Sequence, residues 1–249
     1  MKRLAAILVM LASFAAAFPG ADLWPLLARY GEDVNPILAM EPLAWWRGDG
    51  NALDSSGNDY HGAWTGTEQY ADWYTGQAFD FTALDGYVET AELGAWAPQT
   101  NRTMSLWFLQ KNNDPPSREF MAVWGQSASP FVGIGFSRRL QANRYTGYRS
   151  LTGAAAAINI ATTYPTNSWT HVIVMVGENN LHVRVDGSEY NVDTSAYPQV
   201  APANTGFARR IGRYSAEATF NGYVAQVLLF DRLLSETEIA ILANPESYK

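Results

Sequence analysis

The sequence predicts an all-β protein, an antiparallel sandwich of two sheets that ends in a short helix. Short apolar segments, several of them alternating with polar residues, recur along the chain, and clusters of Gly, Asn, Asp and Pro separate them. This is the pattern of strands joined by turns. The longest apolar segment runs from Tyr223 to Phe230 and is interrupted only by Gln226. It is too short for a buried helix, so it predicts a core strand that pairs near the middle of a sheet.

The final helix is predicted from its N-terminal cap. Ser235 is followed three residues later by Glu238, which makes a capping box, and Ile239 and Leu242 follow at helical spacing. Pro245 sets the end of this helix. We expect the helix to cover an edge or an open end of the sandwich.

The other strands are predicted from alternation and from their turns. In chain order they are residues 43–46, 78–82, 103–110, 119–125, 131–136, 169–176 and 181–186. On the segment 103–110 we expect Met104, Leu106 and Phe108 to share one face, because successive strand residues alternate between faces. The turn residues 177–180, GENN, join the two strands of a hairpin.

The N-terminal region is expected to lie outside the sandwich. Residues 1–17 have the layout of a secretory signal peptide, with two basic residues, a short apolar run and an A-x-A cleavage position. The alternative is a retained N-terminal helix. The apolar run is too short to span a bilayer, so we expect no membrane insertion after removal of the signal. Residues 18–42 are a proline-containing lead-in that docks on the sandwich or on a neighbouring subunit, and residues 43–249 form the sandwich domain.

Composition and charge restrict the class of protein. The chain has 249 residues, of which 47% are hydrophobic and 16% are charged, which indicates one globular domain with a substantial core. The net charge of −7, without a Lys or Arg stripe, argues against a nucleic-acid partner. The absence of Cys excludes disulfides, thiol catalysis and thiolate metal sites.

Several motifs occur in a recognisable order. Residues 54–58 read DSSGN, residues 76–89 read GQAFDFTALDGYVE, residues 169–187 read WTHVIVMVGENNLHVRVDG, and residues 222–235 read GYVAQVLLFDRLLS. Together they resemble laminin-G-like domains of the concanavalin A-like lectin and glucanase superfamily, over residues 43–243. The resemblance implies an antiparallel jelly-roll sandwich. It says less about function, because one fold hosts many functions.

The same resemblance implies a calcium site whose ligands this chain only partly retains. Many members use the Asp of a closing I-D-E segment, and here that Asp and the following Glu are Ala225 and Gln226. The loss of a carboxylate removes both a charge and an oxygen ligand. Asp54, Asn58 and Asp85 remain as candidate metal ligands, although a turn role explains Asp54 better. We therefore expect no cofactor, with bound calcium as the alternative, and little effect of Ca²⁺ on the melting temperature.

The candidate ligand-binding residues are Arg144, Tyr145, Tyr148 and Arg149. They lie in a Gly-bearing hairpin and form the densest group of Tyr and Arg in the sequence. Such side chains stack on sugar rings and hydrogen-bond their hydroxyls. The alternative is that the two tyrosines cap the end of the sandwich.

Catalysis is not indicated. Glucanases of this fold place carboxylates at alternate positions of one strand, and no strand of this sequence does so. His171 and His182 lie within predicted strands and are expected to be packed there. Arg47-Gly48-Asp49 spells an adhesion tripeptide, which three common loop residues also form by chance.

The sequence therefore favours a non-catalytic carbohydrate-binding or adhesion module, secreted or displayed on a surface, whose partner is a glycan or a surface protein. The alternative is a structural protein of a surface layer or virus particle that uses the same fold for protein contacts. A glycoside hydrolase is the weaker third interpretation. The N-terminal lead-in offers a route to oligomers.

Overall fold

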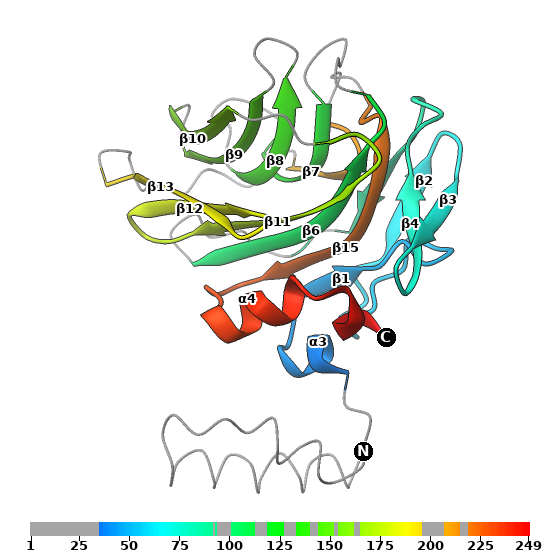
Figure 1. Cartoon of the computed structure of the whole chain (residues 1–249), viewed down its shortest axis with the longest axis horizontal. Coiled ribbons are helices and arrows are strands. Elements are labelled where there is room, and N and C mark those ends of the chain that lie inside the picture. Colours follow the sequence, from blue (N-terminus) through cyan, green and yellow to red (C-terminus); the bar gives the residue numbers. More distant parts are fainter. Residues whose placement is uncertain are drawn as a thin grey trace, which may run out of the picture.

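The computed structural model describes residues 35–91, 93, 101–112, 119–126, 133–139, 144–151, 154–161, 165–195, 207–214 and 219–249. These residues form two antiparallel sheets packed face to face, with short helices on one outer face (Figure 1). The predicted all-β sandwich is confirmed.

One sheet has eight strands. Seven follow the order β13-β12-β11-β6-β15-β4-β3, and the eighth, β1, pairs with β15. Their bounds are β1 Ala44–Trp46, β3 Tyr70–Trp73, β4 Gly76–Asp80, β6 Arg102–Gln110, β11 Trp169–Val176, β12 Asn180–Val185, β13 Ser188–Asp193 and β15 Gly222–Phe230.

The other sheet has seven strands in the order β10-β9-β8-β7-β14-β5-β2. Their bounds are β2 Gly62–Thr65, β5 Tyr87–Thr90, β7 Glu119–Gln126, β8 Gly133–Arg139, β9 Arg144–Leu151, β10 Ala154–Ala161 and β14 Phe207–Ile211.

The closing strand takes the central place that its composition predicts. β15 pairs with β6 on one side and with β4 and β1 on the other. Gln226 interrupts its apolar run at a β-bulge, where its φ is +52° and the register shifts between Ala225 and Leu228. The buried Gln226 amide is satisfied, because its Oε1 accepts a hydrogen bond of 2.8 Å from Trp45 Nε1.

The main core lies between the two sheets. Met104, Leu106 and Phe108 of β6 belong to it and are fully buried, as their predicted common face requires. Trp46 of β1 stacks on Trp124 of β7 across the sandwich, with ring centroids 5.2 Å apart. These contacts join residues far apart in the chain and fix how the sheets are stacked.

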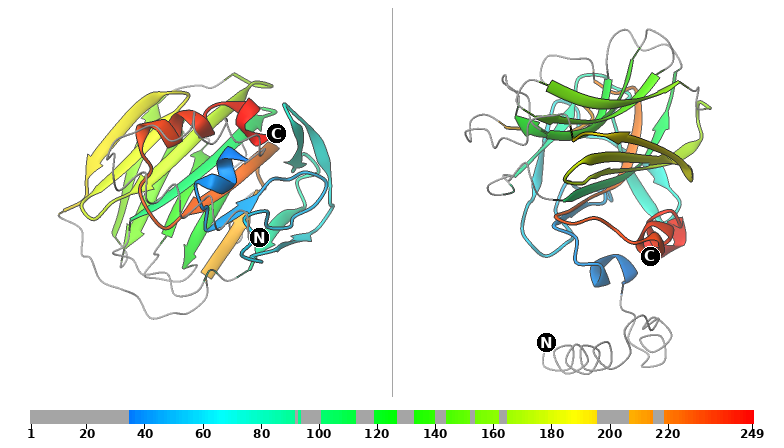
Figure 2. Two further views of the ribbon diagram at one scale, coloured as in Figure 1. Left: turned by 90° about the horizontal axis from the view of Figure 1, so that it is seen from below. Right: turned by 90° about the vertical axis from the view of Figure 1, so that its left-hand side faces the viewer.

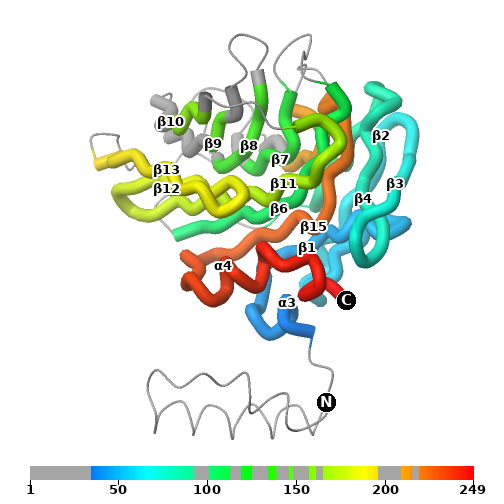
Figure 3. Tube along the Cα trace, viewed as in Figure 1, coloured from blue at the N-terminus to red at the C-terminus, as the bar shows by residue number. Residues whose placement is uncertain are grey.

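A second core lies on the outer face of the eight-stranded sheet. Three short helices cover it: α3 (Pro36–Ala39), α4 (Glu236–Leu242) and the 3₁₀ helix η1 (Pro245–Tyr248). Figure 2 shows them crossing the strands of this sheet when the molecule is seen from below. Figure 3 shows that α3 and the C-terminal end lie on the same side, and Asn35 Nδ2 donates a hydrogen bond of 3.1 Å to Lys249 O.

The predicted capping box is present, but the predicted position of the helix is wrong. Ser235 and Glu238 exchange both capping hydrogen bonds, and Ile239 and Leu242 are buried. The helix packs on a sheet face and not on an edge or an end. The reason is that the outer faces of β6, β11 and β15 are also apolar and need a cover of their own.

None of the helices in the described ranges has the length and apolar composition needed to cross a membrane.

His171 is a buried polar residue of this second region. The prediction that its side chain is packed within the fold is confirmed. Its Nε2 is hydrogen-bonded to the Ser105 hydroxyl at 2.9 Å, and its ring lies 4.9 Å from that of Trp107. Burial lowers the pKa of His171 from 6.5 to about 3, so the folded protein keeps the ring neutral.

The buried ring predicts a loss of stability in acid. The unfolded chain binds a proton at His171 below pH 6.5 and the folded chain does not, so the free energy of unfolding should fall by about 1.4 kcal/mol for each pH unit between 6.5 and 3. Urea unfolding of the wild type and of His171→Gln across this range measures the effect. The variant should show a shallower slope, and equal slopes would contradict a neutral buried His171.

Candidate functional site

Five aromatic residues form a continuous group on the outer face of the eight-stranded sheet. Each ring centroid lies within 6.4 Å of another in the group. We call this group the aromatic strip, and its members are Trp73, Tyr74, Trp107, Trp169 and Tyr223. Trp73 also contacts Tyr248 of η1 at 5.3 Å, so the strip begins where the helical cover ends.

Three adjacent strands position one end of the strip. In the sheet register Leu109 of β6 pairs with Tyr223 of β15 on one side and with Trp169 of β11 on the other. The two rings approach to 6.3 Å at an angle of 38° and straddle Leu109, which is buried. Both aromatic residues are only partly buried, so part of each ring is open to solvent.

The other end of the aromatic strip lies at the turn between β3 and β4. Trp73 ends β3 and meets Trp169 edge-on, with ring centroids 6.4 Å apart and an interplanar angle of 89°. Tyr74 follows it and lies 5.9 Å from Trp107. Tyr74 is 57% exposed, the most exposed of the large hydrophobic and aromatic residues in the described part of the chain.

Polar groups stand beside Tyr223. Lys111 Nζ lies 4.3 Å from the centroid of the Tyr223 ring, a cation–π contact, and donates a hydrogen bond of 3.1 Å to Asn167 Oδ1. Asn167 is exposed and held by its own N–H, which donates to Gln110 O at 2.9 Å. An ammonium and an amide therefore border an aromatic surface.

This arrangement suits a ligand with one apolar face and several hydroxyls. Aromatic faces pack against apolar C–H groups, and ammonium and amide groups hydrogen-bond hydroxyls. The strip could not be predicted from the sequence because its members come from four distant segments. The available signal was local: Trp169 is the first residue of β11 and follows Asn167 and Ser168, and Tyr223 is the second residue of β15.

The predicted ligand residues of β9 lie on the other sheet. β9 is an interior strand between β8 and β10, and Gly147 faces the eight-stranded sheet, because a Cβ there would collide with Val183 of β12. By strand alternation, positions 145 and 149 share the side of Gly147, and positions 144 and 148 share the side of Thr146. The side chains of Arg144, Tyr145, Tyr148 and Arg149 are outside the described part of the structure, so this site remains a prediction.

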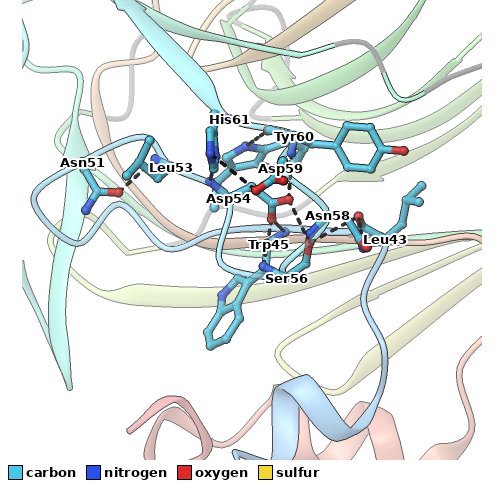
Figure 4. A network of polar contacts seen from close by, with 11 residues as sticks. Leu43, Trp45, Asn51, Leu53, Asp54, Ser56, Asn58, Asp59, Tyr60 and His61 are labelled. Carbon is cyan, nitrogen blue, oxygen red and sulfur yellow. Dashed lines mark hydrogen bonds and ion pairs between the residues drawn. The ribbon is translucent and has the colours of Figure 1, made fainter. Parts of the chain in front are cut away.

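Asp54 organises the loop that follows β1 (Figure 4). Its Oδ1 accepts hydrogen bonds from the N–H groups of Trp45 and Ser56, at 2.8 and 2.9 Å. Its Oδ2 accepts from the Ser56 hydroxyl at 2.8 Å and from Tyr60 N–H at 3.0 Å. Four donors occupy the lone pairs of a carboxylate that is only 8% exposed.

The other two predicted metal ligands are also engaged within the chain. Asn58 donates from its amide nitrogen to Leu43 O at 3.0 Å (Figure 4). Asp85 accepts from the Thr67 hydroxyl at 2.7 Å, and its hydrogen bonds to Thr67 lower the pKa of this carboxyl. Within the described ranges, no three His, Asp or Glu side chains are grouped as a metal site requires. The contacts of Asp54 are those of a turn residue, and calcium binding by these three residues stays a prediction.

The Arg-Gly-Asp tripeptide is bound into the fold. Arg47 pairs with Asp49 at 3.7 Å and donates to Tyr248 O at 3.2 Å. Asp49 Oδ1 accepts a hydrogen bond of 3.1 Å from Gln77 N–H. Gly48 is buried against Phe79 with a φ of +77°, so the tripeptide is not presented as a free loop.

Comparison with known proteins agrees with this fold. The family model of the concanavalin A-like lectin/glucanases superfamily matches residues 81–240. Among curated proteins, none matches the chain.

Solved structures with the same fold include both binding domains and an enzyme. Domain 4 of AbnA, an extracellular arabinanase from Geobacillus stearothermophilus solved with arabinotriose, has a TM-score of 0.68 and 18% identity, over 82% of this chain and 98% of that domain. The binding domain of botulinum neurotoxin DC in complex with SialylT has a TM-score of 0.63 and 14% identity, over 83% of this chain and 52% of that one.

A mutant Trypanosoma rangeli sialidase with trans-sialidase activity has a TM-score of 0.61 and 14% identity, over 84% of this chain and 34% of the sialidase. The chain thus spans about half of the toxin domain and a third of the sialidase. Identities this low show a shared fold and no more.

Replacing Asp54 with Asn should destabilise the protein by about 2 to 3 kcal/mol, because the amide cannot accept all four hydrogen bonds and its NH₂ group faces other donors. The matched control is Asp59→Asn in the same loop, since Asp59 is exposed and Asn tolerates its φ of +61°. We expect the control to change stability by less than about 0.5 kcal/mol. Urea unfolding measures both, and equal losses would show that Asp54 does not hold the loop.

Proposed function

Because the chain belongs to the concanavalin A-like lectin/glucanase superfamily, we propose that it is a non-catalytic carbohydrate-binding module. Two neighbours in fold were solved with sugar ligands, arabinotriose in the AbnA domain and SialylT in the neurotoxin domain. These ligands belong to those proteins. They support the class of ligand proposed here and leave the particular sugar open.

The aromatic strip is the observation that carries the proposal. Trp169 and Tyr223 present partly open rings side by side, and Tyr74 adds an exposed ring. Lys111 and Asn167 stand at the border as hydrogen-bonding groups. A sugar ring would lie with its C–H face on the aromatic surface and its hydroxyls toward Lys111 and Asn167.

The distribution of carboxylates supports binding without turnover. A retaining glycosidase needs two carboxylates about 5 Å apart, which a strand provides at positions i and i+2. In the described strands, no two Asp or Glu residues stand at such positions. This agrees with a binding module and differs from the glucanase arrangement.

We also propose that the chain is secreted, and that β9 carries an alternative binding surface. Residues 1–17 would direct the chain to secretion, so that the module meets glycans outside the cell. Of the four predicted β9 residues, Arg144 and Tyr148 stand at positions on the outer side of the seven-stranded sheet, and these two are the alternative binding surface. The two surfaces are far enough apart in the fold to be tested separately.

A glycan array probed with the full chain should give a signal on a defined group of oligosaccharides, and arabino-oligosaccharides and sialylated oligosaccharides belong on that array. For the best ligand, Trp169→Ala combined with Tyr223→Ala should weaken binding at least tenfold, which is about 1.4 kcal/mol. The matched control is Arg144→Ala combined with Tyr148→Ala, at the outer positions of β9, which should leave the affinity within about twofold. Isothermal titration calorimetry measures both, and circular dichroism checks that each variant is folded.

Other outcomes separate the alternatives. If the β9 variant loses binding and the strip variant keeps it, the site is on the seven-stranded sheet. If the array shows no binding, the carbohydrate-binding proposal is wrong and a module that contacts proteins replaces it.

A further inference from the structure

The edge strand β10 has an unusual composition. It is the last strand of the seven-stranded sheet, and within the described part of the chain it is hydrogen-bonded only to β9. Its eight residues, AAAAINIA, contain no charge and no proline. Ala157 and Asn159 are exposed, and Ile158 and Ile160 are buried in the main core.

The other described edge strands carry protections that the composition of β10 lacks. β13 bears Glu189 and Asp193, β1 is three residues long, and β2 and β3 are four residues long. Charge and shortness are the usual means by which edge strands avoid pairing with other chains. Among the described strands, the outer N–H and C=O groups of β10 have no strand partner, so this long, uncharged edge offers them to another strand.

We propose that β10 pairs antiparallel with β10 of a second copy of this chain, across a two-fold axis at Ala157. The two seven-stranded sheets then become one continuous sheet through the dimer. This interface is isologous, as two-fold dimers require, because each copy offers the same strand. It does not depend on the proposed carbohydrate binding.

The sequence of β10 is complementary to itself in this register. With Ala157 opposite its own copy, Ile158 faces Ala156 and Ile160 faces Ala154. Asn159 faces Ala155 in the same register. Each larger side chain meets an alanine, so no two bulky groups oppose each other, and residues directly opposite share one face of the sheet as an antiparallel pair demands.

The register also keeps the burial pattern intact. Ile158 and Ile160 point to the core side in both copies, so the apolar layer continues across the axis. The interface consists of one strand from each copy, which is small for a protein dimer. We therefore expect a dimer that forms with rising concentration and not an obligate one.

Sedimentation velocity of the full chain over a concentration series tests the proposal. The wild type should shift from monomer to dimer. Ala157→Asp places two carboxylates opposite each other at the axis and should raise the dissociation constant at least tenfold. Ala63→Asp is the matched control, since Ala63 is an exposed alanine on β2, the opposite edge of the same sheet, and it should leave the dimer unchanged.

A cross-link tests the register without relying on the stability of a charged variant. The chain has no cysteine, so Ala157→Cys introduces a single thiol at the axis. Opposite residues of an antiparallel pair are close enough for a disulfide, and mild oxidation should give covalent dimers much faster than with Ala63→Cys. A wild type that stays monomeric throughout the series overturns the proposal. So does a dimer that survives Ala157→Asp, or equal cross-linking of the two cysteine variants.

Discussion

The eight-stranded sheet is apolar on both of its faces, and the rest of the structure follows from the need to cover the second one. The inner face packs on the seven-stranded sheet through residues such as Leu106 and Val224. The outer face carries Trp107, Ile173 and Leu228. Burial of this area stabilises the fold only if other segments cover it. The helices α3, α4 and η1 supply that cover over part of the face, and the aromatic strip occupies the part next to them.

Several polar groups inside this second region are hydrogen-bonded within the fold. Gln226 accepts from Trp45 Nε1 at the bulge of β15, and the Ser105 hydroxyl is hydrogen-bonded to His171. The Tyr248 hydroxyl donates to Leu242 O at 3.0 Å, and burial raises the pKa of that phenol. Such pairing lets a sheet bury polar side chains on its covered face without a large penalty. It also fixes η1 against the sheet, and with it one border of the strip.

The sequence alone predicts the local features well. The strand near residues 223–230, the Ser235 capping box, the common face of Met104 and Phe108, and the packing of His171 all depend on spacing within one segment, and each is confirmed. The position of α4 could not be predicted in the same way. It depends on which strands lie beside β15 in space, and those strands are far away along the chain, as in the pair of Ala44 with Leu229.

The candidate site escaped prediction for the same reason. Trp73, Trp169 and Tyr223 come from three segments that only the finished sheet brings together. Local density of Tyr and Arg pointed instead to β9, where alternation divides neighbouring positions between two faces. Asp54 shows the opposite case, because its role in a turn could be predicted from the sequence around it. The four hydrogen bonds that its side chain accepts explain why a carboxylate stands at this position.

We propose that the part of the outer face left beside the helices is the sugar-binding surface. Nuclear magnetic resonance of the ¹⁵N-labelled full chain tests it directly, because each of the nine tryptophans has its own indole N–H signal. On titration with the oligosaccharide selected by the glycan array, the signals of Trp169 and Trp73 should shift, while those of Trp46 and Trp124, stacked between the sheets, should stay in place. Saturable binding that leaves Trp169 and Trp73 unchanged would contradict the claim.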